Sequence, residues 1–573
     1  MRSFTELKRN LKKDFSAFKK VKIALLGDTS TQFLHQALKG LAYELQLNLD
    51  IFETDFNQIE LQIFNSESEL YSFQPEYVIV FYASHKLLNK FYKTPIQDRS
   101  HFAENKTNQL HEICDKLNQQ LNTKIIIYNF PEIDDQVYGN YANKIASSWL
   151  FQMRKLNYDL ALLSTKLSNL FICDLSSVQN RIGKDNLFRP SVYVNSEMVL
   201  SIDSLPEIAA RTLAIINSLD GKIKKCLILD LDNTTWGGII GDDGLENIQI
   251  GGLGIGKAFS ELQYWAKELK NRGIILAVCS KNTESIAKEP FEKHPDMVLR
   301  LEDIAVFVAN WENKASNIKH IQSVLNIGFD SMVFLDDNPF ERNMVREHLP
   351  LLTVPELPED PAEYLEYLYT LNLFETVSFS ELDIERTKQY QVEAQRVQLQ
   401  QSFVNEDDFL NSLNMLSIVE PFNKFNTPRV AQLSQRSNQF NLRTVRYSES
   451  DISHIGNDAN YASFSFTLED KFGDNGLICA IILKKENEQI FFVDTWFMSC
   501  RVLKRGMERF VLNTICAYAK ENGAQYLKGE YLSTPKNEMV KDHYKNLNFD
   551  AEAEHWLLDV QQYQPSETFI HKK

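Results

Sequence analysis

An apolar run that starts at Cys226 ends in two carboxylates, Asp230 and Asp232. Thr234 and a glycine-rich turn follow them. Side chains two apart on a strand point to the same face, so the two carboxylates can lie together where the strand ends. Like charges held close together are costly unless a cation lies between them. The pattern favours an oxygen-liganded divalent metal; the alternative is a solvated turn after a core strand.

Two further apolar runs downstream also end in polar groups, and a lysine starts a helix between them. These residues are Ser280, Lys281 and Asn282 after the second run, Lys314 at the helix start, and Asp336 and Asp337 after the third run. Because strands alternate with helices, a doubly wound sheet is predicted, with its ligand crevice at the carboxyl ends of the strands. The structural alternatives are a strand-end cap for Ser280 and a solvated helix face for Lys314.

In type, order and spacing, these groups resemble the four motifs of the haloacid dehalogenase (HAD) superfamily. The resemblance implies an aspartyl-phosphate route with Asp230 as nucleophile and Asp232 as general acid and base. It implies Mg²⁺ bound to Asp230, the backbone carbonyl of Asp232, and Asp336, with Asp337 close by. The residues implied at the phosphate are Thr234, Ser280, Lys281, Asn282 and Lys314. Of these, Thr234 is expected chiefly to fix the turn.

The spacing of the motifs leaves no room for a large cap domain. Asp232 and Ser280 are 48 positions apart, and Ser280 and Lys314 are 34 apart. A flap hairpin near 236–250 and a helix near 257–272 fill most of the first interval. Small-molecule HAD enzymes usually cover the site with a cap that excludes water. An open site admits a large substrate, or a partner domain that acts as its lid.

Length and composition set outer bounds on the protein's class. A chain of 573 residues with 43% hydrophobic and 24% charged residues is typical of a globular protein of three or four domains. Its net charge of −16 argues against nucleic-acid or anionic-membrane binding. Seven cysteines without a Cys-x-x-Cys pair indicate a reducing compartment, without structural disulfides or zinc. With no expected membrane span or signal peptide, the cytoplasm is the predicted location.

Residues 1–220 are predicted to form an α/β domain of alternating strands and helices. The first strand ends in Gly27-Asp28-Thr29-Ser30, which resembles the first block of SGNH hydrolases, with Thr29 at the serine position. No Asp-x-x-His is evident near the end of this region, and a hydrolase needs a base beside its nucleophile. An inactive, scaffold-like domain is therefore expected, with His85 and Asn129 as candidates to line its crevice.

Residues 221–360 are predicted to form the HAD-like domain, which a proline-rich acidic stretch closes. Residues 361–573 are predicted to hold a long polar linker helix near 381–401 and an α+β domain whose strand order resembles the GNAT acyltransferase fold. The candidate cofactor-binding loop of that domain contains Arg501, Lys504, Arg505 and Gly506. Lys504 replaces the family's first glycine. Backbone N–H groups at the following helix start, helped by these cations, would hold the phosphates of CoA or phosphopantetheine.

Taken together, the three parts resemble the FkbH-like family, HAD-type proteins with a GNAT-like C-terminal domain and often an SGNH-like N-terminal one. The diagnostic segments include 230–238, 310–314, 336–342, 435–441, 472–476 and 498–501. The best-known members take a glyceryl unit from an acyl phosphate, remove phosphate and load an acyl carrier protein's phosphopantetheine thiol. The resemblance implies a carrier-protein partner and a phosphorylated small-molecule substrate. Cys500 is then a candidate acyl acceptor, activated by nearby cations.

Two other functions stay open from the sequence. The first is a sugar-phosphate phosphatase joined to a CoA-dependent N-acyltransferase that serves surface-polysaccharide synthesis. The second is a non-catalytic scaffold that binds a carrier protein and a phosphorylated ligand. The structural alternative for Cys500 is a small strand-end core residue, and the alternative for the cations that follow it is a solvated helix face.

Overall fold

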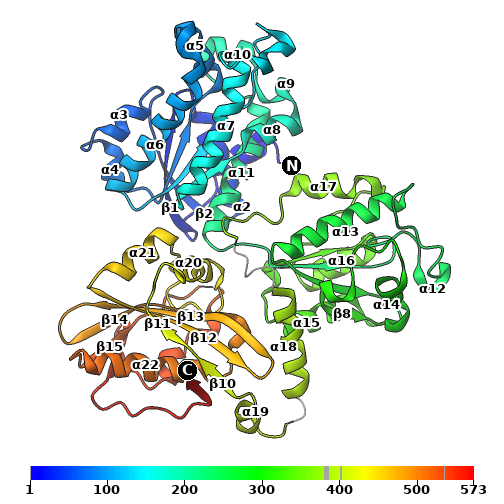
Figure 1. Cartoon of the computed structure of the whole chain (residues 1–573), viewed down its shortest axis with the longest axis vertical. Helices are drawn as coiled ribbons and strands as arrows, with labels where there is room; N and C mark the ends of the chain where they lie inside the picture. The colour runs from blue at the N-terminus through cyan, green and yellow to red at the C-terminus, as the bar shows by residue number, and fades with distance from the viewer. Residues whose placement is uncertain (1, 380–385, 401–402, 535) are drawn as a thin grey trace. The chain divides into compact units, whose positions relative to one another are not determined.

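The computed structural model describes residues 2–379, 386–400, 403–534 and 536–573 (Figure 1). The chain divides into two compact units, Met1–Asn217 and Ser218–Lys573. The described strands form one five-stranded sheet, one four-stranded sheet and one nine-stranded sheet. The predicted fold class is confirmed, with parallel α/β sheets followed by a mainly antiparallel α+β part. The finer division into three domains stays a prediction.

The first unit is built on a parallel sheet in the order β2-β1-β3-β4-β5. Its strands are β1 (Lys19–Gly27), β2 (Leu47–Glu53), β3 (Tyr77–Phe81), β4 (Lys124–Tyr128) and β5 (Leu170–Cys173). All five residues of β3 are buried, as expected for a β-branched strand covered on both faces. The chain places β2 on one side of β1 and β3 on the other, so the strand order reverses between β1 and β3.

Helices pack against this sheet through alternating apolar side chains. The longer ones are α2 (Gln32–Glu44), α5 (Ser84–Lys93), α6 (Phe102–Gln120), α7 (Trp149–Lys166) and α11 (Leu205–Leu219). Val78 and Val80 of β3 lie in one core with Leu110 of α6 and Leu156 of α7. Because the five strands are parallel, their connections to the following helices all leave from the same edge of the sheet.

The second unit opens with a four-stranded parallel sheet in the order β8-β7-β6-β9. The strands are β6 (Cys226–Leu229), β7 (Ile275–Ser280), β8 (Ile304–Ala309) and β9 (Met332–Leu335). The helices that follow them are α13 (Gly256–Asn271), α14 (Glu284–Lys293), α15 (Lys314–Leu325) and α16 (Pro339–His348). The flap carries α12 (Ile240–Asp243) and a bridge between Gly237 and Gln249. Strand order reverses between β6 and β9, where a ligand crevice is expected.

Two helices after the proline-rich stretch pack on this sheet and its helices. Tyr364 and Leu368 of α17 (Tyr364–Leu371) lie in the same core as β6. The long polar helix expected near 381–401 is found as α18 (Arg386–Gln400), and the expected positions 381–385 and 401 lie outside the described residues. The Gln391 side chain of α18 donates to the carbonyls of Glu302 (3.2 Å) and Ile304 (2.9 Å) beside edge strand β8.

The nine-stranded sheet follows α18. Its strands are β10 (Met415–Ser417), β11 (Val419–Glu420), β12 (Tyr461–Asp470), β13 (Gly473–Lys485), β14 (Ile490–Met498), β15 (Tyr526–Gly529), β16 (Asp550–Glu552), β17 (His555–Asp559) and β18 (Ile570–Lys572). Strands β12, β13 and β14 are antiparallel, whereas β14 and β15 are parallel and are joined through α22 (Met507–Glu521). Within the described part of the chain, no helix is both long and apolar enough to cross a membrane.

Candidate active site

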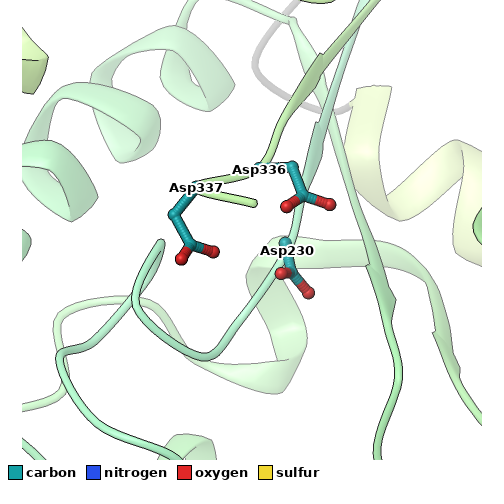
Figure 2. Close-up of side chains that lie close together, drawn as sticks. All are labelled: Asp230, Asp336 and Asp337. Carbon is teal, nitrogen blue, oxygen red and sulfur yellow. The ribbon is translucent and has the colours of Figure 1, made fainter. Parts of the chain in front are cut away.

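Asp230 and Asp336 follow the ends of neighbouring strands at the point where strand order reverses. Leu229 and Leu335 are in register, and the Asp230 amide donates to the Leu335 carbonyl (3.0 Å). Figure 2 shows the carboxylates of Asp230 and Asp336 close together, with the carboxylate of Asp337, the residue after Asp336, beside them. The three acids each offer an oxygen that lies within 4.8 Å of the others. The tertiary structure thus brings together acids from two motifs 106 residues apart.

This cluster has the character of a metal site rather than of a solvated acidic patch. Asp230 is 5% exposed and Asp336 is fully buried. The Oδ1 atom of Asp230 is buried without a hydrogen-bond partner. Buried carboxylates with unused lone pairs are costly unless a cation binds them. The three side chains therefore fit a hard divalent cation such as Mg²⁺, with Asp230, Asp336 and Asp337 as its holders.

Lys314 supplies positive charge to the same carboxylates. Asn313 caps α15 by accepting the Ser316 amide (2.8 Å), so the helix begins at Lys314 beside the sheet edge. The Lys314 Nζ lies 2.8 Å from Asp230 and 2.6 Å from Asp336. Burial alone would lower the pKa of Lys314, but the two carboxylates raise it above its ordinary value. Lys314 therefore stays charged in a buried site.

Asp232 is held apart from the three clustered acids by neutral donors. Its Oδ1 accepts the Trp236 indole N–H (3.0 Å) and the Ile240 amide (3.0 Å), and its Oδ2 accepts the Asn282 side-chain amide (3.0 Å). Burial raises the pKa of Asp232 in spite of these bonds. A carboxyl group with a raised pKa holds its proton to higher pH, which suits a general acid. Trp236 was missed as a site residue, although it opens the flap two residues after Thr234.

Thr234 and Arg342 fix the turn that carries Asp336 and Asp337. The Thr234 hydroxyl accepts the Asp337 amide (3.0 Å) and donates to its Oδ1 (3.3 Å). This geometry matches the turn-fixing role expected of Thr234. Arg342 donates to the backbone carbonyls of both acids from the first turns of α16. Arg342 lies within the motif 336–342, but the sequence predicts no role for it. Only the folded chain shows that its side chain reaches the backbone carbonyls of Asp336 and Asp337.

The residues at the end of β7 take different places. Ser280 is 1% exposed, and its carbonyl accepts the Asn310 amide (3.2 Å). Asn282 enters the site through its bond to Asp232. Lys281 instead forms an ion pair with Glu341 on α16 (2.6 Å), so its ammonium is committed to a protein carboxylate. Phosphate binding by these residues stays a prediction.

The corresponding edge of the first unit has a different make-up. The Thr29 hydroxyl donates to the Glu197 backbone carbonyl, and Asp28 accepts the Ala83 amide (2.8 Å). His85 packs edge-on against Phe188, and burial lowers its pKa to about 4. The predicted candidate Asn129 donates to Asp174 (2.7 Å). The hydrogen bond recorded for the Thr29 hydroxyl thus runs to a carbonyl and not to an imidazole base.

The loop with Cys500 contacts the C-terminal end of α15, whereas the acids lie at its N-terminal end. The Asn326 side chain, just past the end of α15, donates to the Cys500 carbonyl (2.9 Å). Lys314 at the other end of this helix contacts Asp230. Twelve helical residues span about 18 Å. Cys500 is half-buried, and the side chain of Arg501 lies outside the described ones.

The cations after Cys500 are not equivalent. Arg505 is 4% exposed and forms ion pairs with Asp470 (3.1 Å) and Glu393. Lys504 has a left-handed backbone with φ of 63°, and Gly506 caps α22 with φ of 76°. Arg505 therefore belongs to an internal charge cluster, whereas Lys504 and Gly506 lie at the start of α22. Their predicted role in cofactor binding stays untested.

A segment of the chain also occupies the gap between β14 and β15. The two parallel strands pair only as far as Phe492. Beyond that point Asn441 bridges Phe497, the Leu442 amide donates to Trp496 (3.2 Å) and the Met498 amide donates to Phe440 (3.0 Å). Residues 440–442 thereby pair with the edge of β14 that β15 leaves. An extended ligand that adds to a strand edge needs such an edge unpaired.

Comparisons with known proteins agree with this layout. Residues 22–217 match the family model for the FkbH N-terminal domain. A crystal structure of the N-terminal part of the protein BF1531 from Bacteroides fragilis, described as containing a phosphatase domain complexed with Mg, is 56% identical. It covers 66% of this chain and 100% of its own, with a TM-score of 0.64.

More distant matches cover about a quarter of the chain. Spermidine N-acetyltransferase from Vibrio cholerae is 12% identical, covering 26% of this chain and 96% of its own (TM-score 0.22). An N-acetyltransferase from Staphylococcus aureus is 14% identical, covering 26% and 99% (TM-score 0.20). These scores are too low to support a fold or an activity. No curated protein matches the chain.

Proposed function

The chain belongs to the FkbH-like family, and from this premise we propose that Asp230 is the nucleophile of a Mg²⁺-dependent, HAD-type phosphatase. The observation that carries the proposal is the convergence of three carboxylates and one buried lysine where the strand order reverses. A relative that is 56% identical and is described with a phosphatase domain and Mg supports the same chemistry. A binding scaffold has no need of a nucleophile with an acid two residues away.

In the proposed reaction, Asp230 attacks the substrate's phosphorus, so that a bond forms to its carboxylate oxygen and the bond to the leaving oxygen breaks. Asp232 gives its proton to that leaving oxygen. It then takes a proton from the water that hydrolyses the aspartyl-phosphate. Lys314 offsets the negative charge of Asp230 and of the phosphoryl oxygens. A bound Mg²⁺ would supply the Lewis-acid charge that lets a carboxylate approach a phosphate.

The decisive experiment is phosphate release from an acyl phosphate and from a phosphate ester, with and without Mg²⁺. Asp230→Asn keeps the size of the side chain and removes the nucleophile, so release should fall by at least about 1000-fold. Asp242→Asn, which changes an exposed acid of the flap, is the matched control and should retain activity. Release from the phosphate ester that persists in Asp230→Asn, or that needs no divalent cation, contradicts the proposal.

We further propose that the acyl group of an acyl phosphate whose anhydride bond is still intact is passed first to Cys500 and then to the phosphopantetheine thiol of an acyl carrier protein, while Asp230 removes phosphate esters. The supporting observation is a half-buried thiol directly before the turn that starts α22. In this step the Cys500 thiolate attacks the acyl carbon of the intact acyl phosphate, a C–S bond forms, the acyl C–O bond breaks and phosphate leaves. The carrier's thiolate then attacks the same carbon, its own C–S bond forms, and Cys500 leaves as a thiolate. Because Asp230 contacts the start of α15 and Cys500 contacts its end, and the helix is about 18 Å long, the two groups lie at different sites, and a mobile carrier arm would suit this arrangement.

Intact-protein mass after exposure to glyceryl acyl phosphate tests this second step. A glyceryl adduct should form on the wild-type chain, disappear in Cys500→Ala, and persist in Cys516→Ala, where a buried core thiol is changed. Phosphate release without any adduct would leave a phosphatase alone.

Binding of CoA distinguishes the alternative of a sugar-phosphate phosphatase with a CoA-dependent N-acyltransferase. Segment 440–442 already pairs with β14, so neither CoA nor a carrier's phosphopantetheine arm is expected to add to this edge, and the carrier arm must reach Cys500 by another approach. We expect no thermal shift with CoA, and a clear shift with CoA would favour that alternative. A chain inert towards every phosphate compound but tight for a carrier protein would favour the scaffold.

A further inference from the structure

Arg342 connects helix α16 to the backbone of both acids that follow β9. Its side chain is 4% exposed, and its NH1 donates to the carbonyls of Asp336 (2.8 Å) and Asp337 (2.6 Å). One rigid guanidinium group thus binds two successive peptide groups. Because the planar fork has fixed donor directions, the two bonds set the orientation of both peptide planes.

The orientation of these peptide planes decides where the two carboxylates point. Asp336 also accepts the Asn338 amide through its Oδ1 (2.8 Å), and the Thr234 hydroxyl accepts the Asp337 amide (3.0 Å). Those contacts each hold one acid. Arg342 binds the carbonyls of both acids, so it resists rotation of one acid relative to the other.

Burying a guanidinium group costs free energy unless its donors are used and its charge is balanced. The Arg342 Nε donates to Glu356 (2.8 Å), and the two carbonyls take NH1. Glu356 itself lies at the surface, with a side chain 59% exposed. The buried end of Arg342 is therefore directed at the turn, and its exposed partner only balances the charge.

We propose that Arg342 is a positioning residue that sets the Mg²⁺ affinity of the acid cluster by holding the Asp336–Asp337 turn. It touches neither the substrate nor, through its side chain, the carboxylates. The inference rests on the proposed function for the identity of the metal. Outer groups that orient metal ligands typically change metal affinity or activity by about 10–100-fold when they are removed.

Arg346 offers a matched control one helical turn later on α16. It shares the partner Glu356 and donates to the Val354 carbonyl (2.8 Å), while no recorded bond joins it to the carbonyls of Asp336 and Asp337. A loss of helix stability or of the Glu356 ion pair would affect both arginines. A loss of ligand orientation would affect Arg342 alone.

The test is a calorimetric titration of the full chain with MgCl₂, without substrate. Arg342→Gln should weaken the Kd by about 10–100-fold, Arg342→Lys should lie in between because a lysine has no planar fork, and Arg346→Gln should stay within about twofold of wild type. Equal Kd values for wild type and Arg342→Gln, or an equal loss in Arg346→Gln, would overturn the proposal. Should Arg342→Gln fail to fold, Arg342→Lys decides it alone, and a wild-type Kd there would overturn the proposal.

Phosphate release measured at saturating Mg²⁺ separates this inference from the proposed function. If wild type binds Mg²⁺ and releases phosphate while Arg342→Gln has an unchanged Kd, only the role of Arg342 fails. If wild type binds Mg²⁺ without releasing phosphate, the function fails while the role of Arg342 is still decided by the titration. If wild type binds no Mg²⁺, both fail.

Discussion

Two parallel sheets of this chain place an aspartate directly after a strand that borders a reversal of strand order. In the first unit Asp28 follows β1, next to β3, and in the second Asp230 follows β6, next to β9. Asp28 meets a backbone amide, whereas Asp230 meets Asp336 and Lys314. The same topological position thus holds a buried acid whose carboxylate accepts a backbone amide in one sheet, and a carboxylate in direct contact with a lysine and a second acid in the other.

The comparison shows that a reversal of strand order creates a crevice but does not determine which reactive side chains meet in it. Both sheets supply strand ends, helix starts and buried acids. In the second sheet the Lys314 ammonium directly contacts the carboxylates of Asp230 and Asp336, whereas in the first sheet Lys86 binds the backbone carbonyl of Asp28 and the carboxylate of Glu197. A buried acid whose carboxylate is hydrogen-bonded to an amide shifts its pKa and affects stability, whereas carboxylates clustered around a cation can bind and activate a phosphate.

Lys314→Met should have the largest effect, because it removes the cation beside Asp230 and Asp336. Removing one partner of a buried ion pair typically costs about 3–5 kcal/mol. We expect this loss in Mg²⁺-free buffer and a partial recovery with MgCl₂. Urea unfolding with pulsed hydrogen exchange, measured on β6 and β9, reports the effect. Lys319→Met on the exposed face of α15 is the control. Similar stability of the two variants would contradict a stabilising role of Lys314 in the acid cluster.

Asp232→Asn should separate good from poor leaving groups. Without a general acid, hydrolysis of a phosphate ester should slow by about 100–10,000-fold. Hydrolysis of an acyl phosphate should slow less in its first step, because its carboxylate leaving group needs little protonation. Parallel rate measurements on the two substrates check this. An equal loss on both would mean that Asp232 acts mainly on the attacking water.

Asp28→Asn tests the buried acid of the first unit. Burial raises the pKa of Asp28 to about 6 from an ordinary 3.8. The folded chain then binds the proton more tightly than the unfolded chain, so stability is lost as pH rises from about 4 to about 6. At about 1.4 kcal/mol per pKa unit, the variant should gain about 3 kcal/mol at pH 8 and almost none at pH 4.

The measurement for Asp28→Asn is urea unfolding at both pH values, followed on β1 and β3 by pulsed hydrogen exchange. Phosphate release should be unchanged, since Asp28 lies outside the acid cluster. A stability gain of the same size at pH 4 would contradict a titrating Asp28.

Thr29→Val should have the smallest effect. It removes the hydroxyl that donates to the Glu197 carbonyl and should cost about 1 kcal/mol of stability. If the first unit is a scaffold, esterase activity towards simple esters should be absent from wild type and variant alike. An esterase activity that vanishes in Thr29→Val would make the first unit a second catalytic site.

Local sequence patterns anticipated most of the second unit's sheet and its site. Apolar runs ending in Asp230, Ser280 and Asp336 gave the strand ends, because buried parallel strands need apolar side chains on both faces. The proline-rich stretch after Pro355 was less informative than expected, since α17 beyond it still packs in the same core as β6. A sequence breaker ends an element, but it does not show which core the next element joins.

Sequence patterns were least informative where one residue type has several uses. Lys281 and Lys504 both follow apolar strands. Lys281 forms an ion pair with Glu341 on α16, whereas Lys504 lies in the turn before α22. Arg505 belongs to a run of cations that suggests an anion site, but it is buried against Asp470 and Glu393. Charge along the chain is visible in the sequence, whereas the partner of each charge depends on which elements pack together.

The sequence by itself determined the acid pairs, their order and the strands that carry them, because periodicity and residue type are local properties. Only the tertiary structure decided that Arg342 binds the carbonyls of Asp336 and Asp337, that Trp236 binds Asp232, and that Cys500 lies at the far end of α15 from Lys314. Those contacts join residues through side-chain direction and packing, which depend on the folded arrangement of several elements at once.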